Sequence, residues 1–256
     1  MPAVEVINIT KKFPVYEDSS YLSTLHNEQI QGGSFYALSD VSFSIENGEC
    51  TIIAGANGSG KSVLMSVIAG LEAPSYGSVK TCSRVGLVFQ EPDSQILGET
   101  PGEDIAFGPR NMKLSKNEIK ARVCSALSLT GLEHRADFPA RSLSGGEKRR
   151  LAAAGVLAMD SQIIIFDEPY ANMDYPGVVQ VNRLFQKLIN DGKTVIILTH
   201  ELEKCLALSN RFIVLCKGKK VYDGTASDAL SLDLQAWGIH NPLKNTARDL
   251  GDLLWL

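Results

Sequence analysis

The sequence predicts an α/β fold built on a mostly parallel sheet. Short apolar runs that fit strands alternate with helical patterns along the 256 residues. Most of these runs are continuously apolar, which is typical of strands covered by helices on both faces. The segment between Gln90 and Asp160 contains no convincing strand. We therefore expect a helical subdomain inserted into the sheet domain, together with an antiparallel β part.

The expected strands are of two kinds. Val4–Ile9 and Val41–Ile45 alternate apolar and polar residues, as half-buried strands do. The continuous apolar runs, expected in the buried sheet, are Thr51–Ala54, Val85–Phe89, Ile163–Asp167, Thr194–Leu198 and Phe212–Leu215. Lys219–Tyr222 follows the turn Lys217-Gly218 and can close a last hairpin with the strand before it.

Helices are expected between these strands. One starts at Lys61, and three more span about Lys116–Thr130, Gly146–Met159 and Gly177–Asn190. Ser115 and Glu118 have capping-box spacing, which places the start of the second helix at Lys116.

The domain organisation follows from these elements. We expect one main domain over residues 1–224, with its helical subdomain at about 91–160, and a C-terminal helical tail over 225–256. Pro14–Ser34 is polar and has no clear period, so we expect a loop or hairpin insertion there.

Composition limits the class of protein. The chain is 44% hydrophobic and 21% charged, as in ordinary globular proteins, and its net charge of -4 does not favour a general nucleic-acid binder. Its five cysteines show no zinc-like spacing, so we expect structural thiols, with Cys50 and Cys216 in buried strands, in a reducing cytosol. We expect neither a signal peptide nor a membrane span, and any membrane role through a partner.

The segment from Gly55 to Ser62 has the pattern of a phosphate-binding loop. Gly55, Ala56, Asn57, Gly58, Ser59, Gly60, Lys61 and Ser62 match G-x-x-x-x-G-K-[ST] in full. The pattern follows an expected strand and precedes the helical run Val63–Leu71, the context that it requires. Glycines let backbone N–H groups turn toward phosphate oxygens, and the helix N-terminus adds unpaired donors. We expect Lys61 to reach the β- and γ-phosphates of ATP, aiding catalysis, and Ser62 to bind Mg²⁺.

Two adjacent carboxylates end the apolar strand Ile163–Asp167. Ligands bind at the carboxyl ends of strands in open α/β sheets, so Asp167 is expected on the Mg²⁺ side of the site. Glu168 is the candidate general base that orients and deprotonates the attacking water. The alternative is that Glu168, followed by Pro169, simply opens the next helix as an N-terminal acid.

Two further polar residues follow expected strands. His200 comes after Thr194–Leu198 and can donate a hydrogen bond to the γ-phosphate, although a surface histidine is the alternative. Gln90 comes after Val85–Phe89 and can touch Mg²⁺ or the lytic water, although a polar strand cap is the alternative. Because Gln90 leads into the helical subdomain, it is also a candidate transmitter between nucleotide and partner.

A second glycine-flanked helix start lies at Leu143-Ser144-Gly145-Gly146-Glu147. Ser144 and Glu147 have capping-box spacing, and bare glycines leave the helix N-terminus open to an anion. One chain that binds one nucleotide has little use for two such sites. A dimer has a use for both, if Ser144 to Gly146 of each subunit cover the γ-phosphate held by the other subunit.

With these motifs the chain resembles the nucleotide-binding subunits of ABC transporters. The resemblance covers nearly all of residues 3–224. It implies the P-loop ATPase fold of that family and a head-to-tail dimer with two ATP molecules between phosphate loop and opposite signature. It further implies that Asp174, in Ala171-Asn172-Met173-Asp174, is the aspartate of the D-loop, and that Phe13 stacks on adenine.

A narrower resemblance points to the ATPase subunits of energy-coupling factor importers. It rests on Val88–Ile96 (VFQEPDSQI), Glu103–Pro109 (EDIAFGP) and Leu143–Leu157 (LSGGEKRRLAAAGVL). That group takes up vitamins and transition-metal ions such as cobalt or nickel. The resemblance implies a second ATPase subunit, identical or closely related, a transmembrane coupling subunit and a small membrane substrate-binding subunit, at the cytoplasmic face of the membrane. Another class of ABC transporter, or an ABC ATPase without a transport role, is the alternative.

Three features depart from the pattern of the family. Tyr170 stands where a small residue usually follows the Glu-Pro pair, and Met173 stands where leucine usually precedes the D-loop aspartate. The insertion at Pro14–Ser34 lengthens the link after Phe13, which makes Tyr36 a rival for the adenine contact. None of these departures removes a catalytic group.

Overall fold

The computed structural model describes residues 1–15 and 29–243. Within these ranges the chain forms two compact units. Of the described residues, the first unit contains 1–15, 29–82 and 196–243, and the second contains 83–195. Most of the predicted insertion at 14–34, and the tail from residue 244, lie outside the described residues.

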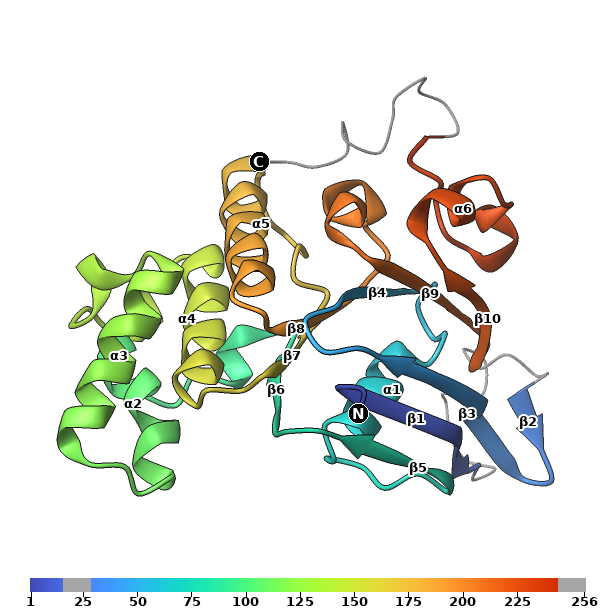
Figure 1. Cartoon of the computed structure of the whole chain (residues 1–256), viewed down its shortest axis with the longest axis horizontal. Coiled ribbons are helices and arrows are strands. Elements are labelled where there is room, and N and C mark those ends of the chain that lie inside the picture. The colour runs from blue at the N-terminus through green and yellow to red at the C-terminus, as the bar shows by residue number, and fades with distance from the viewer. Residues whose placement is uncertain (16–28, 244–256) are drawn as a thin grey trace. The chain divides into compact units, whose positions relative to one another are not determined.

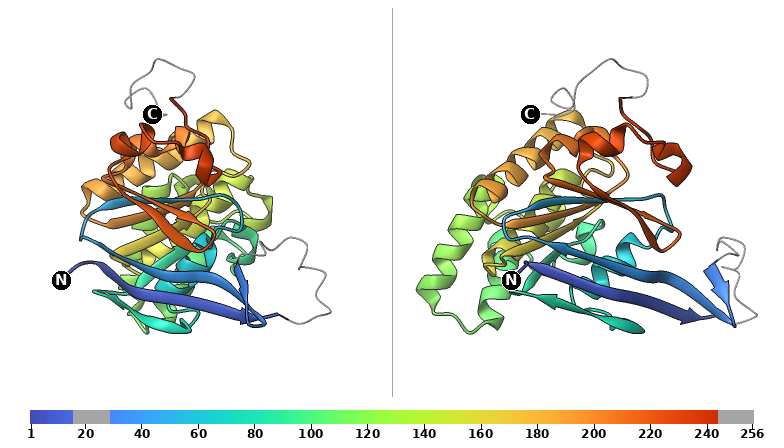
Figure 2. Two further views of the ribbon diagram at one scale, coloured as in Figure 1. Left: turned by 90° about the vertical axis from the view of Figure 1, so that its right-hand side faces the viewer. Right: turned by 45° about the vertical axis from the view of Figure 1, so that its right-hand side comes forward.

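The first unit contains an antiparallel sheet in the order β2-β3-β1-β5 (Figure 1). Its strands are β1 (Val4–Pro14), β2 (Ile30–Gln31), β3 (Ser34–Ile45) and β5 (Tyr76–Thr81). Val4 lies opposite Ile45 on one side and opposite Thr81 on the other. The strands β3, β1 and β5 run side by side in both views of Figure 2. Buried residues alternate along β1 and β3, which confirms the predicted half-buried strands.

The other strands of the first unit are almost wholly buried, except for β10, whose residues are exposed or partly buried. β4 (Cys50–Ala54) pairs in parallel with β9 (Arg211–Cys216), which forms an antiparallel hairpin with β10 (Lys219–Gly224). The neighbour of β4 on its other side is β8 (Thr194–Thr199). Helix α1 (Lys61–Ile68) follows β4 directly. The short helix α6 (Ala226–Leu230) and the 3₁₀ turn η8 (Leu234–Trp237) form the described part of the predicted helical tail.

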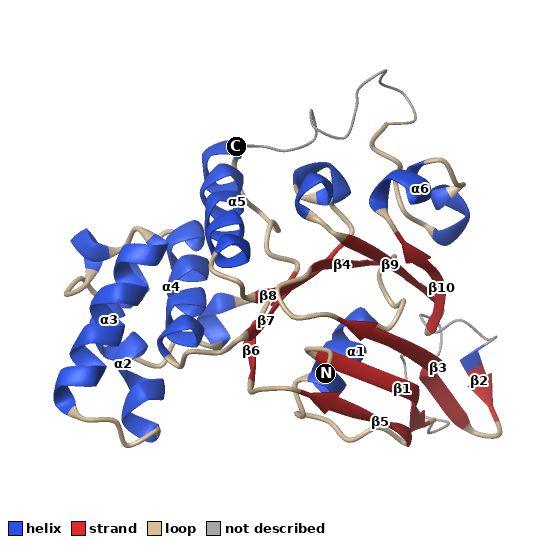
Figure 3. Ribbon diagram, viewed as in Figure 1, coloured by secondary structure: helices blue, strands red, loops and turns tan. Residues whose placement is uncertain are grey.

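The second unit combines two parallel strands with four helices, coloured by type in Figure 3. β6 (Val85–Val88) pairs in parallel with β7 (Ile163–Asp167). The helices are α2 (Pro101–Asn111), α3 (Lys116–Thr130), α4 (Gly145–Ala158) and α5 (Tyr175–Asn190). Residues of α2, α3 and α4, among them Ile105, Leu127 and Leu151, bury a common core.

The predicted α/β class with parallel and antiparallel strands is confirmed. Every predicted strand and helix exists, and most bounds agree within about two residues. The exceptions are β1, which continues five residues beyond the predicted Val4–Ile9, and β3, which begins seven residues before the predicted Val41–Ile45. The segment from Gln90 to Asp160, described throughout, contains no strand. Two elements were missed. α2 carries Pro109 inside the helix, a residue that normally ends one, and β5 leaves four of its six residues exposed, which weakens its alternation. The predicted domain boundaries stay predictions.

Cysteine and membrane expectations can be compared with the described residues. Cys50 is fully buried and burial raises the pKa of its thiol to about 12, which makes it an inert core residue. Cys216 is only partly buried, because it is the last residue of β9. Over the described ranges, the helices are too short or too polar to cross a membrane.

Candidate nucleotide-binding and hydrolysis site

The predicted phosphate loop lies in the first unit, between β4 and α1. Gly60 is the N-cap of α1 with φ 103°, and no side chain caps the helix. A Cβ at Gly60 would lie 2.6 Å from the carbonyl oxygen of Ala37, so only glycine fits there. At Gly58, with φ 77°, a Cβ would meet nothing within 4 Å. The N-terminus of α1 is therefore bare, with open space at the loop, as a phosphate cradle requires.

Lys61 is held inside this loop. Its side chain is buried, and its Nζ donates to the carbonyl oxygens of Gly55 at 2.6 Å and Ala56 at 3.4 Å. Ser59 is also buried, and its Oγ has no hydrogen-bond partner among the described residues. A buried cation beside bare backbone donors fits the triphosphate of a nucleotide. The residues present thus meet the requirement that the motif predicted.

Residues far away in the sequence contact the backbone of the phosphate loop, and no sequence pattern predicts these contacts. Gly218, in the turn between β9 and β10, donates its N–H to the carbonyl oxygen of Ser59 at 3.0 Å. The carbonyl oxygen of Gly218 accepts from the N–H of Ser39 on β3 at 2.8 Å. A Cβ at Gly238, after η8, would lie 3.0 Å from that of Ala56. The turn at Gly218, itself bonded to β3, therefore holds the backbone of the phosphate loop at Ser59, and Gly238 lies close to the loop at Ala56.

His200 lies in the same unit and follows β8, the neighbour of β4 in the sheet. The side chain of His200 is exposed. Thr199 before it is fully buried, and its Oγ1 accepts from the N–H of Glu201 at 3.0 Å, which fixes the turn. His200 is thus presented to solvent from a rigid strand end, which suits a residue that contacts a ligand.

The two rival adenine contacts are neighbours on the antiparallel sheet. Phe13 on β1 lies opposite Phe35, and Tyr36 lies opposite Lys12. The Nζ of Lys11 lies 5.0 Å from the centre of the Phe13 ring. Both Phe13 and Tyr36 are partly buried, so each leaves part of its ring open to a ligand.

The paired carboxylates lie in the second unit, at the carboxyl end of β7. Asp167 is 8% exposed and Glu168 is 6% exposed. Glu168 has φ 43°, a left-handed conformation that costs a non-glycine residue roughly 1–3 kcal/mol. Helix α5 begins only at Tyr175, so Glu168 is not an acid in its first turn. The alternative role as a helix-opening acid is therefore wrong, and the strained backbone is typical of a functional site.

Asp174, the predicted D-loop aspartate, is the N-cap of α5. Its Oδ1 accepts from the N–H of Gly177 at 3.0 Å. Tyr170, which departs from the family pattern, is fully buried, and its hydroxyl lies 2.6 Å from Oδ1 of Asn182. The larger side chain thus packs in the core against Asn182 and Phe185 of α5.

The signature forms the predicted capping box at the start of α4. Oγ of Ser144 accepts from the N–H of Glu147 at 3.3 Å, and Oε2 of Glu147 accepts from the N–H of Ser144 at 2.8 Å. Nε of Arg135 lies 3.1 Å from Glu147 Oε1. The hydrogen bond from the Ser144 backbone, with help from Arg135, lowers the pKa of Glu147. Sequence reasoning predicted the capping box but not the arginine.

A groove of about 520 Å³ brings the signature and the D-loop together. It is lined by Ser144, Gly145 and Gly146 from the signature and by Asn172, Met173 and Asp174 from the D-loop, among others. The structure therefore places the two motifs on one concave surface of the second unit, although they are 28 positions apart, counting from Ser144 to Asn172. Such a surface can receive a ligand from outside the unit.

Gln90 is exposed, two residues after the end of β6. The side chain that fixes this segment is Gln95, which sequence reasoning did not single out. Oε1 of Gln95 accepts from the N–H of Phe89 at 3.1 Å, and its Nε2 donates to the carbonyl oxygen of Leu87 at 2.9 Å. Gln95 thus holds the loop that carries Gln90 against the end of the strand.

A profile of the family described as ABC transporter matches residues 38–171. The energy-coupling factor transporter ATP-binding protein EcfA of Carboxydothermus hydrogenoformans is 40% identical over 75% of this chain and 76% of its own length. EcfA2 of Methanospirillum hungatei is 38% identical over 76% of this chain, but the match spans only 53% of that longer relative.

Two solved structures have the same fold. CbiO1 of Clostridium perfringens, described as part of the ABC transporter complex CbiONQ, has a TM-score of 0.76 and 31% identity, covering 90% of this chain and 91% of that one. A dimeric ATP-binding cassette in a post-hydrolysis state with ADP and Pi has a TM-score of 0.73 and 28% identity, covering 87% and 98%. The chain belongs to the ABC transporter family of ATP-binding proteins, and it is an ATPase of that fold.

Proposed function

We propose that this chain is the ATP-hydrolysing subunit of an importer of the energy-coupling factor type. It would drive uptake of a vitamin or transition-metal ion through membrane partner subunits, from the cytoplasmic face of the membrane. The names of the relatives support this subtype, as does the CbiONQ complex to which CbiO1 belongs. The observation that carries the proposal is that one chain has two helix N-termini suited to phosphate. The N-terminus of α1 follows Gly60 and has the buried Lys61 beside it, whereas the N-terminus of α4 follows Ser144 and has no such lysine.

The residues of the phosphate loop bind and orient the nucleotide. The bare N-terminus of α1 and the ammonium of Lys61 neutralise the β- and γ-phosphates, the largest contribution expected in phosphoryl transfer. Glu168 accepts a proton from the attacking water, while Gln90 and His200 orient the water and the γ-phosphate. The left-handed backbone of Glu168 fixes where its carboxylate points.

Mg²⁺ is the metal that the donor set fits. Ser62 offers a hydroxyl in the first turn of α1, and Asp167 offers a buried carboxylate at the end of β7. Both are hard oxygen donors, which Mg²⁺ prefers, and few protein ligands leave room for phosphate oxygens and water. When bound, the metal would supply charge neutralisation at the β- and γ-phosphates.

The second helix start is proposed to act in a dimer. The groove beside Ser144 and Gly146 is open and carries the D-loop residues on its other wall. A γ-phosphate held by a second ATPase subunit would enter this groove and accept from the N-terminus of α4. Loss of that phosphate on hydrolysis removes the ligand that bridges the two subunits, so they separate. The similar dimeric cassette with ADP and Pi supports this arrangement.

The membrane partners are proposed to contact the second unit. Large apolar side chains are exposed there in and after the loop that carries Gln90: Phe89, Leu97 and Phe107 are 36%, 67% and 48% exposed. Large exposed apolar side chains close together in the sequence, such as Phe89 and Leu97, are typical of a protein interface where they gather on one surface. A transmembrane coupling subunit would cover them, and a small membrane subunit would bind the transported substrate.

Affinity purification tests the proposal. The tagged chain is isolated from its native membranes in mild detergent, and the proteins that accompany it are identified by mass spectrometry. We expect a polytopic coupling subunit together with a small hydrophobic partner. Recovery of ribosomes or DNA, or of no membrane protein, would overturn the transport proposal in favour of a non-transport ABC ATPase. A polytopic pair without the small partner would favour another class of ABC transporter.

A further inference from the structure

Two basic residues of α4 reach back to the loop after β6. We call residues 89–98 the 90s loop; it contains Gln90 and the 3₁₀ turn η3 (Pro92–Ser94). Nζ of Lys148 lies 2.6 Å from Oδ1 of Asp93, and the lysine side chain is only 18% exposed. A terminal nitrogen of Arg149 lies 3.5 Å from the carbonyl oxygen of Gln90. Both basic residues directly follow the signature on the same helix.

The 90s loop is itself held at both ends. Gln95 bonds to Leu87 and Phe89 at its start, as described above. Near its end, Oδ1 of Asp104 on α2 accepts from the N–H groups of Leu97 at 2.7 Å and Gly98 at 2.9 Å. A segment fixed in this way moves as a piece when it is pushed. Its two contacts with α4 then determine where that motion goes.

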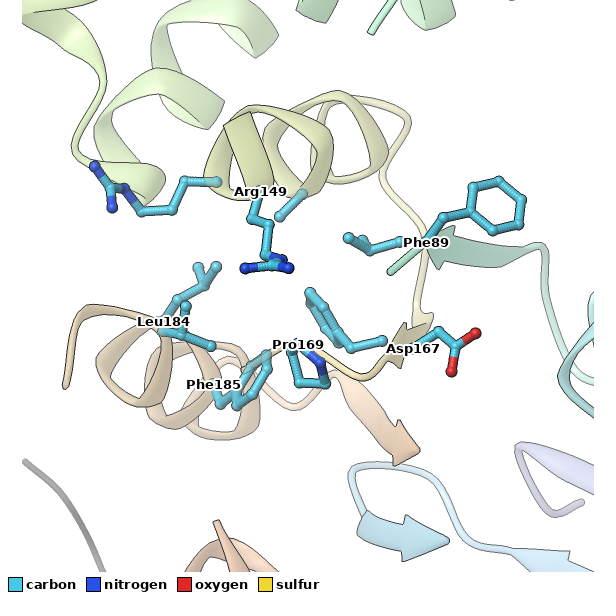
Figure 4. Close-up of a pocket in the computed structure, with 11 residues that line it drawn as sticks. Phe89, Arg149, Asp167, Pro169, Leu184 and Phe185 are labelled. Atoms are coloured by element: carbon cyan, nitrogen blue, oxygen red, sulfur yellow. The ribbon is translucent and has the colours of Figure 1, made fainter. Parts of the chain in front are cut away.

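Arg149 also lies at the carboxyl end of β7. Its side chain points into a small apolar cavity lined by Val88, Phe166, Pro169 and Phe185, among others (Figure 4). The carboxylate of Asp167, whose residue lines the same cavity, points away from it in Figure 4. The cavity offers about 20 Å³, enough for about one water molecule. This space is too small for a substrate. We interpret it as the place where α4 packs against the ends of β6 and β7 and against α5, with the Arg149 side chain between them.

We propose that Lys148 and Arg149 are positioning residues that join the 90s loop to the signature helix and to the end of β7. A displacement of the 90s loop would pass through Asp93 and Gln90 to α4, and so to Ser144 at its start. The same displacement would move Arg149 beside Asp167. That a membrane partner displaces the loop rests on the proposed function. The link between the 90s loop, α4 and the end of β7 does not depend on that function.

A merely structural role for these residues makes a different prediction. Asp93 is 73% exposed, and a pair with one exposed partner adds little to global stability. Its removal would then leave the mobility of the 90s loop unchanged. If Lys148 instead links the 90s loop to α4, the loop is held only when positions 93 and 148 carry opposite charges. A charge swap separates the two roles, because it preserves the pair while it changes both residues.

The test uses hydrogen exchange of residues 89–98 in the purified chain, with and without ATP, and needs no membrane partner. The variants are Asp93→Lys, Lys148→Asp, the double swap, Arg149→Ala and Arg149→Lys. The matched control is Arg183→Ala, which removes an exposed arginine from α5. Thermal unfolding of each variant monitors global stability separately from the loop. Basal kcat and KM for ATP are measured in parallel.

We expect each charge reversal to speed exchange of the 90s loop about threefold to fivefold, the upper part of the range for an exposed ion pair, with the swap restoring the parent's rate. Arg149→Ala should speed exchange at least as much and lower kcat more than KM changes, with partial rescue by lysine. The control should stay within twofold of the parent. The proposal would be wrong if the single charge reversals left exchange of the 90s loop unchanged. It would also be wrong if the double swap exchanged as fast as the single variants. Failure to recover membrane partners in the separate purification bears on the transport proposal alone.

Discussion

The turn at Gly218 should control both stability and nucleotide affinity. Gly218 has φ 76°, and a Cβ there would lie 2.7 Å from the carbonyl oxygen of Ala37. Gly192, after α5, has the same φ of 76° but open space around a Cβ. Substitution of either glycine by alanine therefore carries the same backbone strain and the same gain from a stiffer unfolded chain. Only Gly218→Ala adds a collision.

The magnitudes follow from that comparison. A left-handed alanine costs roughly 1–2 kcal/mol, and an added methyl in a filled space costs a further 1–3 kcal/mol or so. Gly218→Ala should thus be less stable than Gly192→Ala by about 1–3 kcal/mol, or ~2–12 °C in Tm for a chain of this length. Displacement of Gly218 also disturbs its bond to the Ser59 carbonyl, so ATP affinity should fall about 2- to 12-fold.

Thermal unfolding and nucleotide titration of the two variants check this account. We expect Gly192→Ala to lose a few degrees of Tm and to keep the parent's ATP affinity. If the two variants lose equal stability, the collision with Ala37 does not occur. If Gly218→Ala loses stability but binds ATP normally, the turn does not brace the phosphate loop.

Three other substitutions each remove a hydrogen-bonding group that the structure shows in use. Tyr170→Phe removes the hydroxyl bonded to buried Asn182 and should cost about 1–3 kcal/mol in denaturant unfolding with unchanged ATP affinity; an unchanged midpoint would contradict it. Burial raises the pKa of Asp223, but the hydrogen bonds from Arg211 outweigh burial, so the net effect is a lowered pKa. The carboxylate therefore stabilises the folded chain above its unfolded pKa near 3.8, and this stabilisation is lost as the pH falls below that value. Asp223→Asn should therefore show a smaller drop in Tm between pH 5 and pH 3 than the parent, and an equal drop would refute this. Ser144→Ala removes the cap of α4 and should cost about 0.5–2 kcal/mol while lowering ATPase activity; full activity would remove the serine from the site.

Local patterns predicted much of the fold because their causes are local. The capping box of Ser115 and Glu118 placed the start of α3 at Lys116, where the structure has it. The continuous apolar run of β7 gave both ends of that strand. By contrast, α2 was missed because its stability comes from a core shared with α3 and α4, which outweighs the cost of Pro109 inside the helix.

The candidate site was predictable where a residue type and its spacing carry the chemistry. The phosphate loop and the capping box of the signature are of this kind, and the structure shows the geometry expected of both. Gln95 and Gly218 were missed because their partners are brought near by the fold, and nothing in the neighbouring sequence marks them. The left-handed conformation of Glu168 was likewise invisible in the sequence, since glutamate rarely adopts it.

The most direct test of the account is the variant Glu168→Gln. It keeps the shape of the side chain but removes the proposed base, with Glu103→Gln, at an exposed position of α2, as control. ATP turnover is measured together with the molar mass in solution, by light scattering, in the presence of ATP and Mg²⁺. We expect turnover to fall by at least about 100-fold, a typical contribution of a general base, with a stable ATP-bound dimer. Turnover near that of the parent, or a chain that stays monomeric with ATP bound, would contradict the account.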